Sequence, residues 1–516
     1  MDSTARDLEA ESPPAEDYLA AESKKIAKGG IIVIVGALIS QGLSILATLW
    51  IARVLGPEKY GLISLALSIL LPLAALAALG LPNALVRFIP VHMGNKENDK
   101  ISGVVSSAFI MAAIASLLIA AAVFILSPLI ANRIFSEPLL EPVLRILALT
   151  IPLIVLMNLA TAATRGSQVM HYDAIVQIAG PIFRLLTWVA GLYLLKNLLD
   201  AAIYASLFQQ LFPALLALAF AYWIFRKYFG QGIHWAFKPL WIYSAPLILS
   251  TLMYNLAPRM DRLVLGVVSD ARAVGIYSAA ASLMFILSLV HTSVVKNFLP
   301  IIADAYNRVS IERARMLYIT VTRWDARLTF VVVASSLLVA QEILSVMGER
   351  YSEALLPFVI LGVAVYVGTI PGPTGALLQM TNRQRVEAAN AILFFVLSPF
   401  VQFGMAMWLD WIGVAVGVLV MAIIINTVQI VEIYHFYGFH AFQRDHLLFA
   451  VLSTVVVASC AVAAVTQDLT VRLALLGLVG GSFLAFIYFN RTPDDQMIFN
   501  MFRERIRLGK SQEKPN

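Results

Sequence analysis

Long apolar segments, separated by short polar connections, run along the chain from Ile26 to Asn490. Each segment is long enough for an α-helix to cross about 30 Å of hydrocarbon. This pattern predicts an all-α polytopic membrane protein with about 14 transmembrane helices. The predicted spans are residues 26–52, 61–86, 101–132, 142–164, 172–195, 199–225, 239–268, 273–296, 322–347, 353–380, 386–408, 411–434, 446–466 and 471–490.

Three short motifs occur twice, in the same order and at nearly the same separation of about 210 residues. Many transporters are built from such internal repeats. We therefore predict two pseudo-symmetric six-helix bundles followed by two additional helices. The matching pairs are Leu55-Gly56 with Leu265-Gly266, Tyr60 to Ser64 with Val274 to Ser278, and Phe88-Ile89-Pro90 with Phe298-Leu299-Pro300.

The repeat and the spans predict how the chain is divided. We expect an N-terminal bundle at 24–228, a C-terminal bundle at 229–440 and the two additional helices at 441–490. Before and after these, we expect a disordered acidic cytoplasmic tail at 1–23 and a basic cytoplasmic tail at 491–516.

Three local patterns refine this plan. The longest predicted inner loop, 298–321, is suited to lie on the membrane surface as an amphipathic helix. The stretch 495–508 is either a basic interfacial helix or a solvated tail. Gly413-x-x-x-Gly417 predicts a close helix approach, and Pro371-x-Pro373 predicts a bent or broken helix.

Composition supports the membrane class. The chain is 60% hydrophobic and 13% charged, with a mean hydropathy of +0.82, whereas ordinary globular chains are about 25% charged. The net charge of +6 is therefore attributed to cytoplasmic loops, and no nucleic acid partner is expected. The single cysteine, Cys460, excludes an intramolecular disulfide and a thiolate metal cluster.

The distribution of basic residues predicts the orientation. Of the 37 lysine and arginine residues, 26 fall on the side that contains the N-terminus, 10 fall on the other side, and Arg184 lies within a span. Basic loops stay in the cytoplasm. We therefore expect a multi-pass cell membrane protein with both termini cytoplasmic.

No motif for catalysis is evident. The chain has no Walker A lysine motif, no GxGxxG fingerprint and no HExxH, and its seven histidines are not spaced as zinc ligands. We therefore expect neither an enzyme nor a resident metal or cofactor, and Na⁺ or H⁺ coupling is left open.

Charged residues inside predicted spans are costly and are therefore candidates for function. Arg184 lies near the middle of the fifth span, where it either pairs with a neighbouring carboxylate or binds an anion in a central cavity; we favour the cavity. Arg259 and Arg262 flank Asp261 near the outer end of the seventh span. This cluster is either an interfacial anchor or part of the transport path, and Asp261 is the candidate for cation or proton coupling.

Uncharged polar residues in the spans are weaker candidates, because most such side chains only join helices by hydrogen bonds. Gln177, Asn255 and Gln41 are the ones we expect to touch a substrate. His291 can titrate near neutral pH, although a lone histidine is more often a packing residue.

The stretch from Ala52 to Gly61, ARVLGPEKYG, resembles a signature near the first outer loop of the polysaccharide transporter family. Those proteins are the O-antigen-type flippases of the multidrug/oligosaccharidyl-lipid/polysaccharide exporter superfamily. The resemblance covers residues 24–490. Further matching stretches are Gly80 to Pro90, Asp261 to Ala280, Tyr351-x-x-Ala354 and Thr381-Asn382-Arg383.

The resemblance implies two six-helix bundles related by a pseudo-two-fold axis along the membrane normal, plus two further helices. It also implies a substrate, an oligosaccharide linked through phosphate or diphosphate to a polyprenyl lipid and moved from the inner to the outer leaflet by alternating access. Such a substrate needs a hydrated cationic cavity, for which Arg184 is a suitable group. The implied partners are membrane lipids, glycosyltransferases and a glycan polymerase or ligase.

Other functions make different demands on the sequence. A drug or metabolite exporter of the same superfamily, coupled to Na⁺ or H⁺, predicts an intramembrane carboxylate in the N-terminal half, and we find none well inside the first six spans. The lipid II flippase is a closer relative that differs mainly in its substrate. A membrane glycan ligase or polymerase predicts a large outer loop, which the chain lacks, and a structural scaffold leaves Arg184 unexplained.

Overall fold

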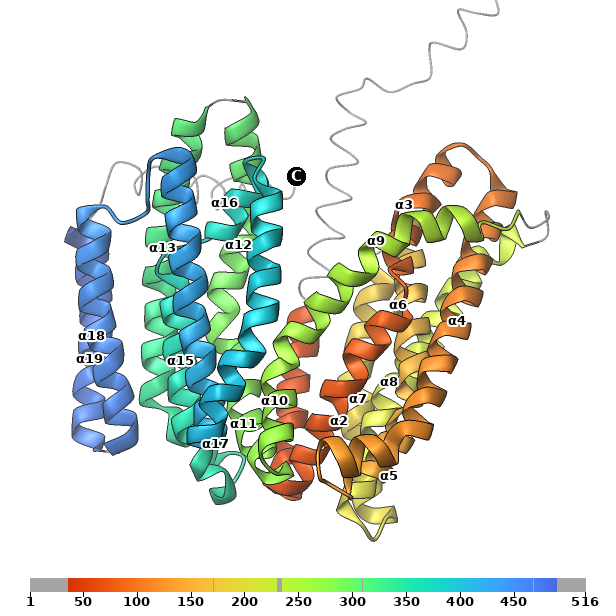
Figure 1. Cartoon of the computed structure of the whole chain (residues 1–516), viewed down its shortest axis with the longest axis horizontal. Helices are drawn as coiled ribbons and strands as arrows, with labels where there is room; N and C mark the ends of the chain where they lie inside the picture. The colour runs from red at the N-terminus through yellow and green to blue at the C-terminus, as the bar shows by residue number, and fades with distance from the viewer. Residues whose placement is uncertain (1–35, 170, 230–233, 309, 467, 490–516) are drawn as a thin grey trace, which may run out of the picture. The chain divides into compact units, whose positions relative to one another are not determined.

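The computed structural model describes residues 36–169, 171–229, 234–308, 310–466 and 468–489, and their regular secondary structure is entirely helical (Figure 1). Eleven helices are long and apolar enough to cross a membrane. One of them, α17 (Gln384–Tyr437), is two helices joined at Asp410, whose φ of 53° and ψ of −131° are not helical. With α13 (Ile311–Leu338) and α19 (Leu469–Phe489), the described residues hold fourteen helical passes, so the predicted fold class is confirmed.

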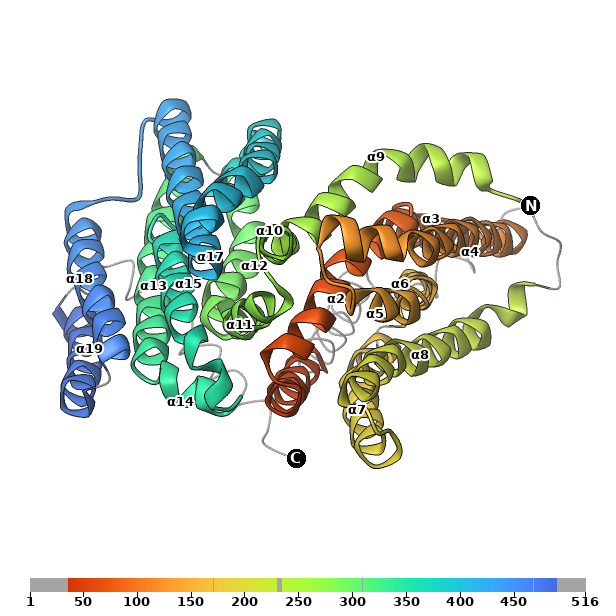
Figure 2. The same cartoon turned by 60° about the horizontal axis from the view of Figure 1, so that its bottom comes forward.

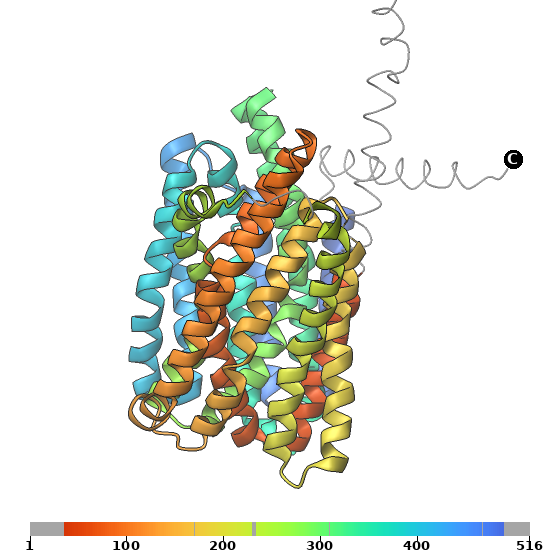
Figure 3. The same ribbon diagram turned by 90° about the vertical axis from the view of Figure 1, so that its right-hand side faces the viewer.

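The described chain forms two compact units. The first unit comprises the residues up to Leu55 together with Leu65–Pro258, and the second comprises Gly56–Ser64 and the residues from Arg259 onward. Figure 3 shows the helices of the first unit, coloured red to yellow-green. Its elements are the first helix (Gly36–Leu55), most of α2 (Pro57–Ala77), α3 (Leu81–Gly94), α4 (Asn98–Leu129), a π-helical turn (Ile130–Ile134), α5 (Leu140–Leu147), α6 (Thr150–Gly166), α7 (His171–Leu194), α8 (Leu198–Phe225), a 3₁₀ turn (Arg226–Tyr228) and α9 (Phe237–Leu256).

The unit boundary lies about 30 residues later than the predicted boundary at 228/229, because α9 packs on α3 and α4. Two glycines allow this approach. Gly80 has a φ of +70°, and a Cβ there would lie 2.7 Å from the carbonyl oxygen of Ser244. A Cβ on Gly103 would lie 1.7 Å from the carbonyl oxygen of His234. The segment before and within α9 is therefore built into the first unit.

The second unit contains the remaining helices. Within it, α12 packs along α13, and α15 packs along α17. Its elements are a 3₁₀ turn that ends at Arg259, α10 (Met260–Val268), α11 (Ala271–Ser282), α12 (Met284–Arg308), α13, α14 (Ala340–Ser345), a 3₁₀ helix (Glu349–Ala354), α15 (Leu355–Thr369), α16 (Thr374–Met380), α17, α18 (Arg444–Thr466) and α19.

The segment 298–321, which the sequence predicts as an inner loop, is helical over most of its length, and its position relative to the membrane surface stays a prediction. These residues complete α12 and begin α13, and Ser310 caps α13 by accepting a hydrogen bond from the backbone N–H of Arg313. Phe298, Ile302 and Tyr318 join an apolar core there, so the segment is held inside the unit.

The earlier start of α13 places three charged residues in the middle of a helix. The sequence-based span placed Arg323, Asp325 and Arg327 at the beginning of a helix. In the structure they lie in the middle of α13 and are buried, with exposures of 4%, 0% and 2%.

The two halves of α17 form an antiparallel hairpin that brings the small-residue motif into close contact. A Cβ on Gly413 would lie 2.0 Å from the carbonyl oxygen of Met405, and one on Gly417 would lie 2.9 Å from the Cα of Gln402. The predicted close approach of the GxxxG segment is confirmed.

The two additional helices belong to the second unit. α18 packs on α13 and α15, and α19 packs on α13 and α18 (Figure 2). Arg472 of α19 donates from Nε to the carbonyl oxygen of Leu338 at 2.6 Å and pairs with Glu342. The predicted tails at 1–23 and 491–516, including the stretch 495–508, lie outside the described residues.

Candidate functional site

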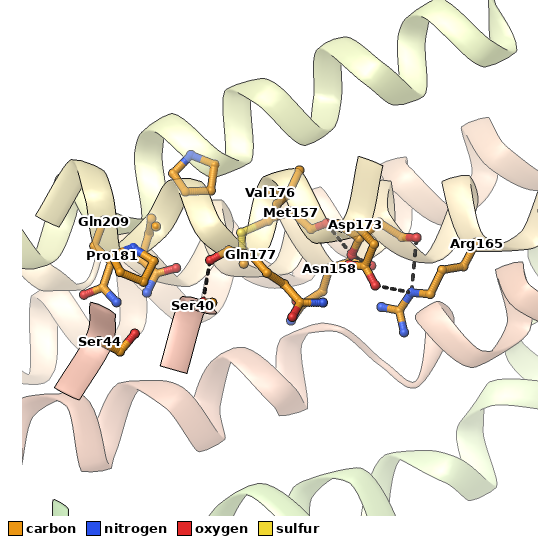
Figure 4. A pocket seen from close by; sticks show the side chains of 14 residues that line it. Ser40, Ser44, Met157, Asn158, Arg165, Asp173, Val176, Gln177, Pro181 and Gln209 are labelled. Atoms are coloured by element: carbon orange, nitrogen blue, oxygen red, sulfur yellow. Dashed lines mark hydrogen bonds and ion pairs between the residues drawn. The ribbon is translucent and has the colours of Figure 1, made fainter. Parts of the chain in front are cut away.

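The first unit contains a polar pocket of about 290 Å³ between its first helix and α6, α7 and α8 (Figure 4). Its polar lining carries one carboxylate, one guanidinium, four carboxamides and three hydroxyls. The lining residues are Ser40, Ser44, Met157, Asn158, Thr161, Arg165, Asp173, Val176, Gln177, Gly180, Pro181, Gln209, Gln210 and Pro213.

Small residues bring the pocket walls together. α7 approaches α8 at Gly180, where a Cβ would lie 3.5 Å from the carbonyl oxygen of Gln209. The first helix meets α7 at Ser40, whose hydroxyl donates to the carbonyl oxygen of Gln177 at 2.7 Å. The backbone contacts thus leave the amide side chain of Gln177 at the pocket.

The two charges in the pocket lie opposite each other on α6 and α7. Arg165 Nε is 3.6 Å from Asp173 Oδ2 and donates to the carbonyl oxygen of Thr161 at 3.3 Å. The side chain of Asp173 is 9% exposed, whereas that of Arg165 is 49% exposed. The charges balance, and the guanidinium retains an accessible side.

The four carboxamides are the main hydrogen-bonding groups of the pocket. Within the described part of the chain, the side-chain amides of Asn158, Gln177, Gln209 and Gln210 have no recorded hydrogen-bond partner. Each amide offers two donor hydrogens and an acceptor oxygen. The pocket can therefore bind an uncharged ligand that is rich in hydroxyl groups.

Of the residues expected to bind substrate, Gln177 lines this pocket and Arg184 lies beside it. Arg184 is 8% exposed and donates from one guanidinium nitrogen to the hydroxyl of Thr48 on the first helix at 3.1 Å. It is not part of the lining. Its bond to Thr48 joins α7 to the first helix, and the expected role of Arg184 in a central cavity stays a prediction.

Gln41 and Asn255 are also outside the pocket lining. Gln41 is next to the pocket residue Ser40 in the first helix. Asn255 donates to the carbonyl oxygen of Thr251, one turn earlier in α9, at 2.9 Å. The structure does not bring either of them together with Gln177 in the pocket.

In the second unit, Asp261 is held by bonds to residues close to it in the chain. The carboxylate accepts a hydrogen bond from the backbone N–H of Arg262 at 2.7 Å and from the hydroxyl of the buried Tyr277 at 2.9 Å. Arg262 also approaches it at 3.8 Å. Neither Asp261 nor the flanking Arg259 and Arg262 line the pockets described here. The contacts favour an anchoring role over the predicted coupling role.

A second polar pocket, of about 320 Å³, lies in the second unit between α12, the α15–α16 break and α17. Thr374 donates to the side-chain oxygen of Gln429 at 2.5 Å, and Gln429 donates to Glu387 at 3.0 Å. The lining residues are His291, Val295, Leu299, Gly368, Gly372, Pro373, Thr374, Gly375, Ala376, Gln379, Glu387, Asn426 and Gln429.

The break predicted at Pro371-x-Pro373 forms one wall of this pocket. Gly372 has a φ of +77° and packs on Thr322, while Tyr318 donates to the carbonyl oxygen of Pro371 at 2.7 Å. Non-helical backbone at membrane depth occurs where it is buried in protein or lines a cavity. The predicted break is confirmed, and its freed carbonyl groups have partners in the unit.

The two pockets occupy partly equivalent places in the predicted repeat, since the earlier helix that lines them is the first pass of one set and the second pass of the other. In each set of six passes, the fourth, fifth and sixth helices contribute to the lining, together with one earlier helix. A carboxylate stands near the start of the fifth helix in both sets, Asp173 in α7 and Glu387 in α17. This correspondence agrees with the internal duplication.

Sequence reasoning missed Arg165, Asp173 and Glu387 because they lie at the edges of the predicted spans, where charged residues are common. The spacing of polar residues near them did indicate a shared helix face. Asp173 and Gln177 are four residues apart, as are Met157 and Thr161, so each pair falls on one helix face.

Comparisons with known proteins identify relatives. Residues 26–306 match the family model described as polysaccharide biosynthesis protein. A putative O-antigen transporter of Shigella flexneri is 24% identical over 259 residues, which are 49% of this chain and 60% of that protein. The match thus spans less than two thirds of that relative.

Solved structures show the same fold. The lipid II flippase MurJ in an inward closed conformation has a TM-score of 0.66 at 12% identity, covering 89% of this chain and 99% of that one. An inward-facing multidrug resistance MATE family transporter of the MOP superfamily has a TM-score of 0.61 at 16% identity, covering 82% and 99%. A MOP superfamily transporter from Pyrococcus furiosus has a TM-score of 0.53 at 16% identity, covering 84% and 96%.

Proposed function

This chain belongs to the polysaccharide biosynthesis protein family, and we propose that it is a multi-pass membrane transporter that flips a lipid-linked oligosaccharide. The substrate would be joined to a polyprenyl carrier through phosphate or diphosphate. It would move from the inner to the outer leaflet of the cell membrane by alternating access, for surface glycan assembly.

The amide-rich pocket of the first unit carries the proposal. Four carboxamides, three hydroxyls and a balanced ion pair surround about 290 Å³, a volume at the lower end of those usual for small-molecule sites. Sugar hydroxyls both donate and accept hydrogen bonds, as carboxamides do. One or two sugar units would therefore replace here the hydrogen bonds that they lose when they leave water.

The charged linkage of the substrate needs a cation. Arg165 is the candidate, because its guanidinium lies in the pocket and its side chain is 49% exposed. Guanidinium groups bind phosphate oxygens through paired hydrogen bonds. Arg184 would act indirectly, by holding the first helix against α7 through Thr48.

The setting of the transporter follows from the same proposal. Both termini would be cytoplasmic, and the polyprenyl chain would stay in the surrounding lipid. Glycosyltransferases would supply the glycolipid, and a glycan polymerase or ligase would use it on the outer side.

A second candidate function is a drug or metabolite exporter coupled to Na⁺ or H⁺. It is favoured by one observation: Asp173, in the N-terminal half, has a side chain that is only 9% exposed and lines the pocket. That is the buried carboxylate which such an exporter requires and which the sequence analysis did not identify. The amide lining favours the glycolipid instead.

Transport of a labelled lipid tests the proposal. Purified protein in proteoliposomes is given a fluorescent polyprenyl-diphosphate oligosaccharide, and access of an impermeant glycosidase to the lipid is followed in time. We expect movement by the wild-type protein and about tenfold slower movement by Gln177→Leu, since two amide hydrogen bonds of about 0.7 kcal/mol each are lost.

The matched control is Gln443→Leu, which changes an exposed glutamine outside the pocket and should keep the wild-type rate. Equal rates for Gln177→Leu and wild type would remove the pocket from the transport path. Absence of glycolipid movement, together with export of a cationic dye, would replace the flippase by the drug exporter.

A further inference from the structure

An apolar groove of about 370 Å³ lies between α4 and α8 in the first unit. Both helices pack on α6 (Figure 2). The lining of the groove is aliphatic or aromatic except for Ser106. Phe109 of α4 and Leu218 of α8 line it and also pack against an apolar cluster that includes Ala160 of α6. The groove therefore has a packed apolar floor.

The segment before α9 forms a further wall of the groove. The backbone N–H of Ala236 donates to the hydroxyl of Ser107 at 2.9 Å. His234 Nε2 lies 3.3 Å from Asp99 Oδ2 at the start of α4. Trp235, which lines the groove, stands between these two anchored residues. Its place in the wall is therefore set by contacts on both of its sides in the chain.

The groove opens to the surroundings of the unit. Ile110, Tyr222 and Trp235 line it and are 40%, 67% and 55% exposed. α4 and α8 are both long and apolar enough to cross a membrane. An open apolar groove between two such helices borders hydrocarbon, where a polypeptide segment would lack partners for its backbone groups. A lipid chain has no such groups and suits the groove.

Two cations stand next to the apolar lining. Arg226 and Lys227 follow α8 in a 3₁₀ turn that packs on α4, and both are exposed. The lining residues Phe225 and Phe229 precede and follow this turn. Lys227 Nζ lies 5.0 Å from the ring centre of Tyr228, whose ring centre lies 6.1 Å from that of Phe225. One end of the groove is thus basic.

The acidic residues near this end have other partners. Glu97 pairs with Lys100, and Asp99 contacts His234. Among the residues that the structure describes, the two cations of the turn have no recorded ion pair, and Lys238 in the first turn of α9 adds a third exposed cation. The basic end of the groove is therefore complementary to an anion.

We propose that the groove between α4 and α8 binds an acyl chain of an anionic phospholipid, whose phosphate is held by Arg226 and Lys227. Guanidinium groups bind phosphate oxygens through paired hydrogen bonds, and a lysine adds a point charge. The turn lies on the predicted cytoplasmic side, where the leaflet is negatively charged. This proposal does not depend on the flippase.

The charged head of the lipid decides which lipid is bound. Lipid chains are as apolar as the side chains of the groove, so the chain by itself gains little when it leaves the bilayer. Each basic residue near the membrane surface, in contrast, strengthens the binding of an anionic lipid several-fold. A zwitterionic phospholipid should therefore occupy the groove much less often.

Trp235 provides a reporter for the chain, because bromine atoms quench tryptophan fluorescence only at short range. The full chain is placed in nanodiscs of phosphatidylcholine that contain a small fraction of phosphatidylglycerol with brominated acyl chains. The emission of Trp235 is the difference between the wild type and Trp235→Phe, which keeps an aromatic ring in the wall. We expect brominated phosphatidylglycerol to quench this emission at a lower fraction than brominated phosphatidylcholine.

The cations are tested by substitution, with each variant compared with its own Trp235→Phe form. Arg226→Gln and Lys227→Gln should each raise the fraction of brominated phosphatidylglycerol needed for half quenching about fivefold. The matched control is Lys196→Gln, an exposed lysine just before the opposite end of α8, which should behave as the wild type. Equal thermal unfolding midpoints verify that the variants are folded.

A second tryptophan controls for lipid that is not bound specifically. Trp408 of α17 in the second unit is 88% exposed. Its emission, obtained from Trp408→Phe in the same way, should be quenched equally by the two brominated lipids.

Each outcome decides the proposal. Selective quenching of Trp235 that is lost in the two charge variants and kept in Lys196→Gln supports it. Equal quenching of Trp235 by both brominated lipids, selectivity kept in both charge variants, or no quenching by either lipid overturns it. Relief of the quenching by a polyprenyl phosphate at a lower fraction than by unbrominated phosphatidylglycerol would replace the phospholipid by a carrier lipid.

Discussion

Gly61 and Gly275 pack backbone to backbone inside the second unit. A Cβ on Gly61 would lie 1.7 Å from the carbonyl oxygen of Ala271, and a Cβ on Gly275 would lie 1.9 Å from the carbonyl oxygen of Pro57. The two glycines occupy equivalent places in the repeated motif, so the two copies of that motif meet each other. Both belong to the second unit, since the division of the chain passes through α2.

The first prediction concerns this contact. Gly61→Ala and Gly275→Ala should each lower the free energy of unfolding by about 3 kcal/mol, because a methyl group has no space between two backbones. The measurement is thermal unfolding in detergent, followed by tryptophan fluorescence. The control is Gly404→Ala, which adds a methyl group in open space and should be neutral or slightly stabilising. Equal midpoints for all four proteins would contradict the packing.

The second prediction concerns the hydrogen bond between Arg184 and Thr48. Thr48→Val should lower stability by about 1 kcal/mol, since it removes the acceptor of a charged donor. Arg184→Met should cost more, and the double variant should be less destabilised than the sum of the two. Unfolding midpoints of the four proteins of this cycle measure the coupling. Strict additivity would mean that the two side chains act independently.

The third prediction concerns the ion pair of the first pocket. Arg165→Ala leaves the carboxylate of Asp173 buried without its paired charge, so stability should fall by about 2 kcal/mol. Asp173→Asn in the same background should restore part of the loss, because the remaining side chain is neutral. The exposed Arg133 provides the control Arg133→Ala. No recovery of stability in the double variant would show that the unpaired charge of Asp173 does not cause the loss of stability in Arg165→Ala.

The fourth prediction uses the single cysteine as a reporter. Cys460 is buried in α18, so it should react slowly with a maleimide in the native protein. Arg472→Met removes the bonds that hold α19 to Leu338 and Glu342. If these bonds stabilise the packing of α19 by about 1.5 kcal/mol, their removal should raise the population in which the thiol is exposed about tenfold, and the labelling rate with it.

The control for the thiol experiment is Arg444→Met, an exposed position at the start of α18. Its labelling rate should equal that of the wild type. If both variants react at the same rate as wild type, α19 does not protect Cys460 through Arg472.

The sequence by itself determined the class of the protein, the number of helical passes and the internal repeat. These follow from local physics: an apolar run of sufficient length must form a helix in hydrocarbon, since its backbone groups find no other partners there. For the same local reason, Gly413 and Gly417 indicated a close helix contact and Pro371 with Pro373 indicated a helix break. The polysaccharide transporter resemblance was carried by short motifs of the same chain.

Only the tertiary structure decided which polar residues share a pocket. Arg184 and Gln177 lie on the same helix, yet their side chains have different surroundings, because the positions of the first helix and α8 decide which face of α7 borders the pocket. Asp325 was placed at a helix end until the start of α13 was known. The contact with His291 joins residues 34 positions apart. Hydropathy records the average cost of a segment in the membrane, whereas the pairing of buried charges depends on distances between helices that no local pattern contains.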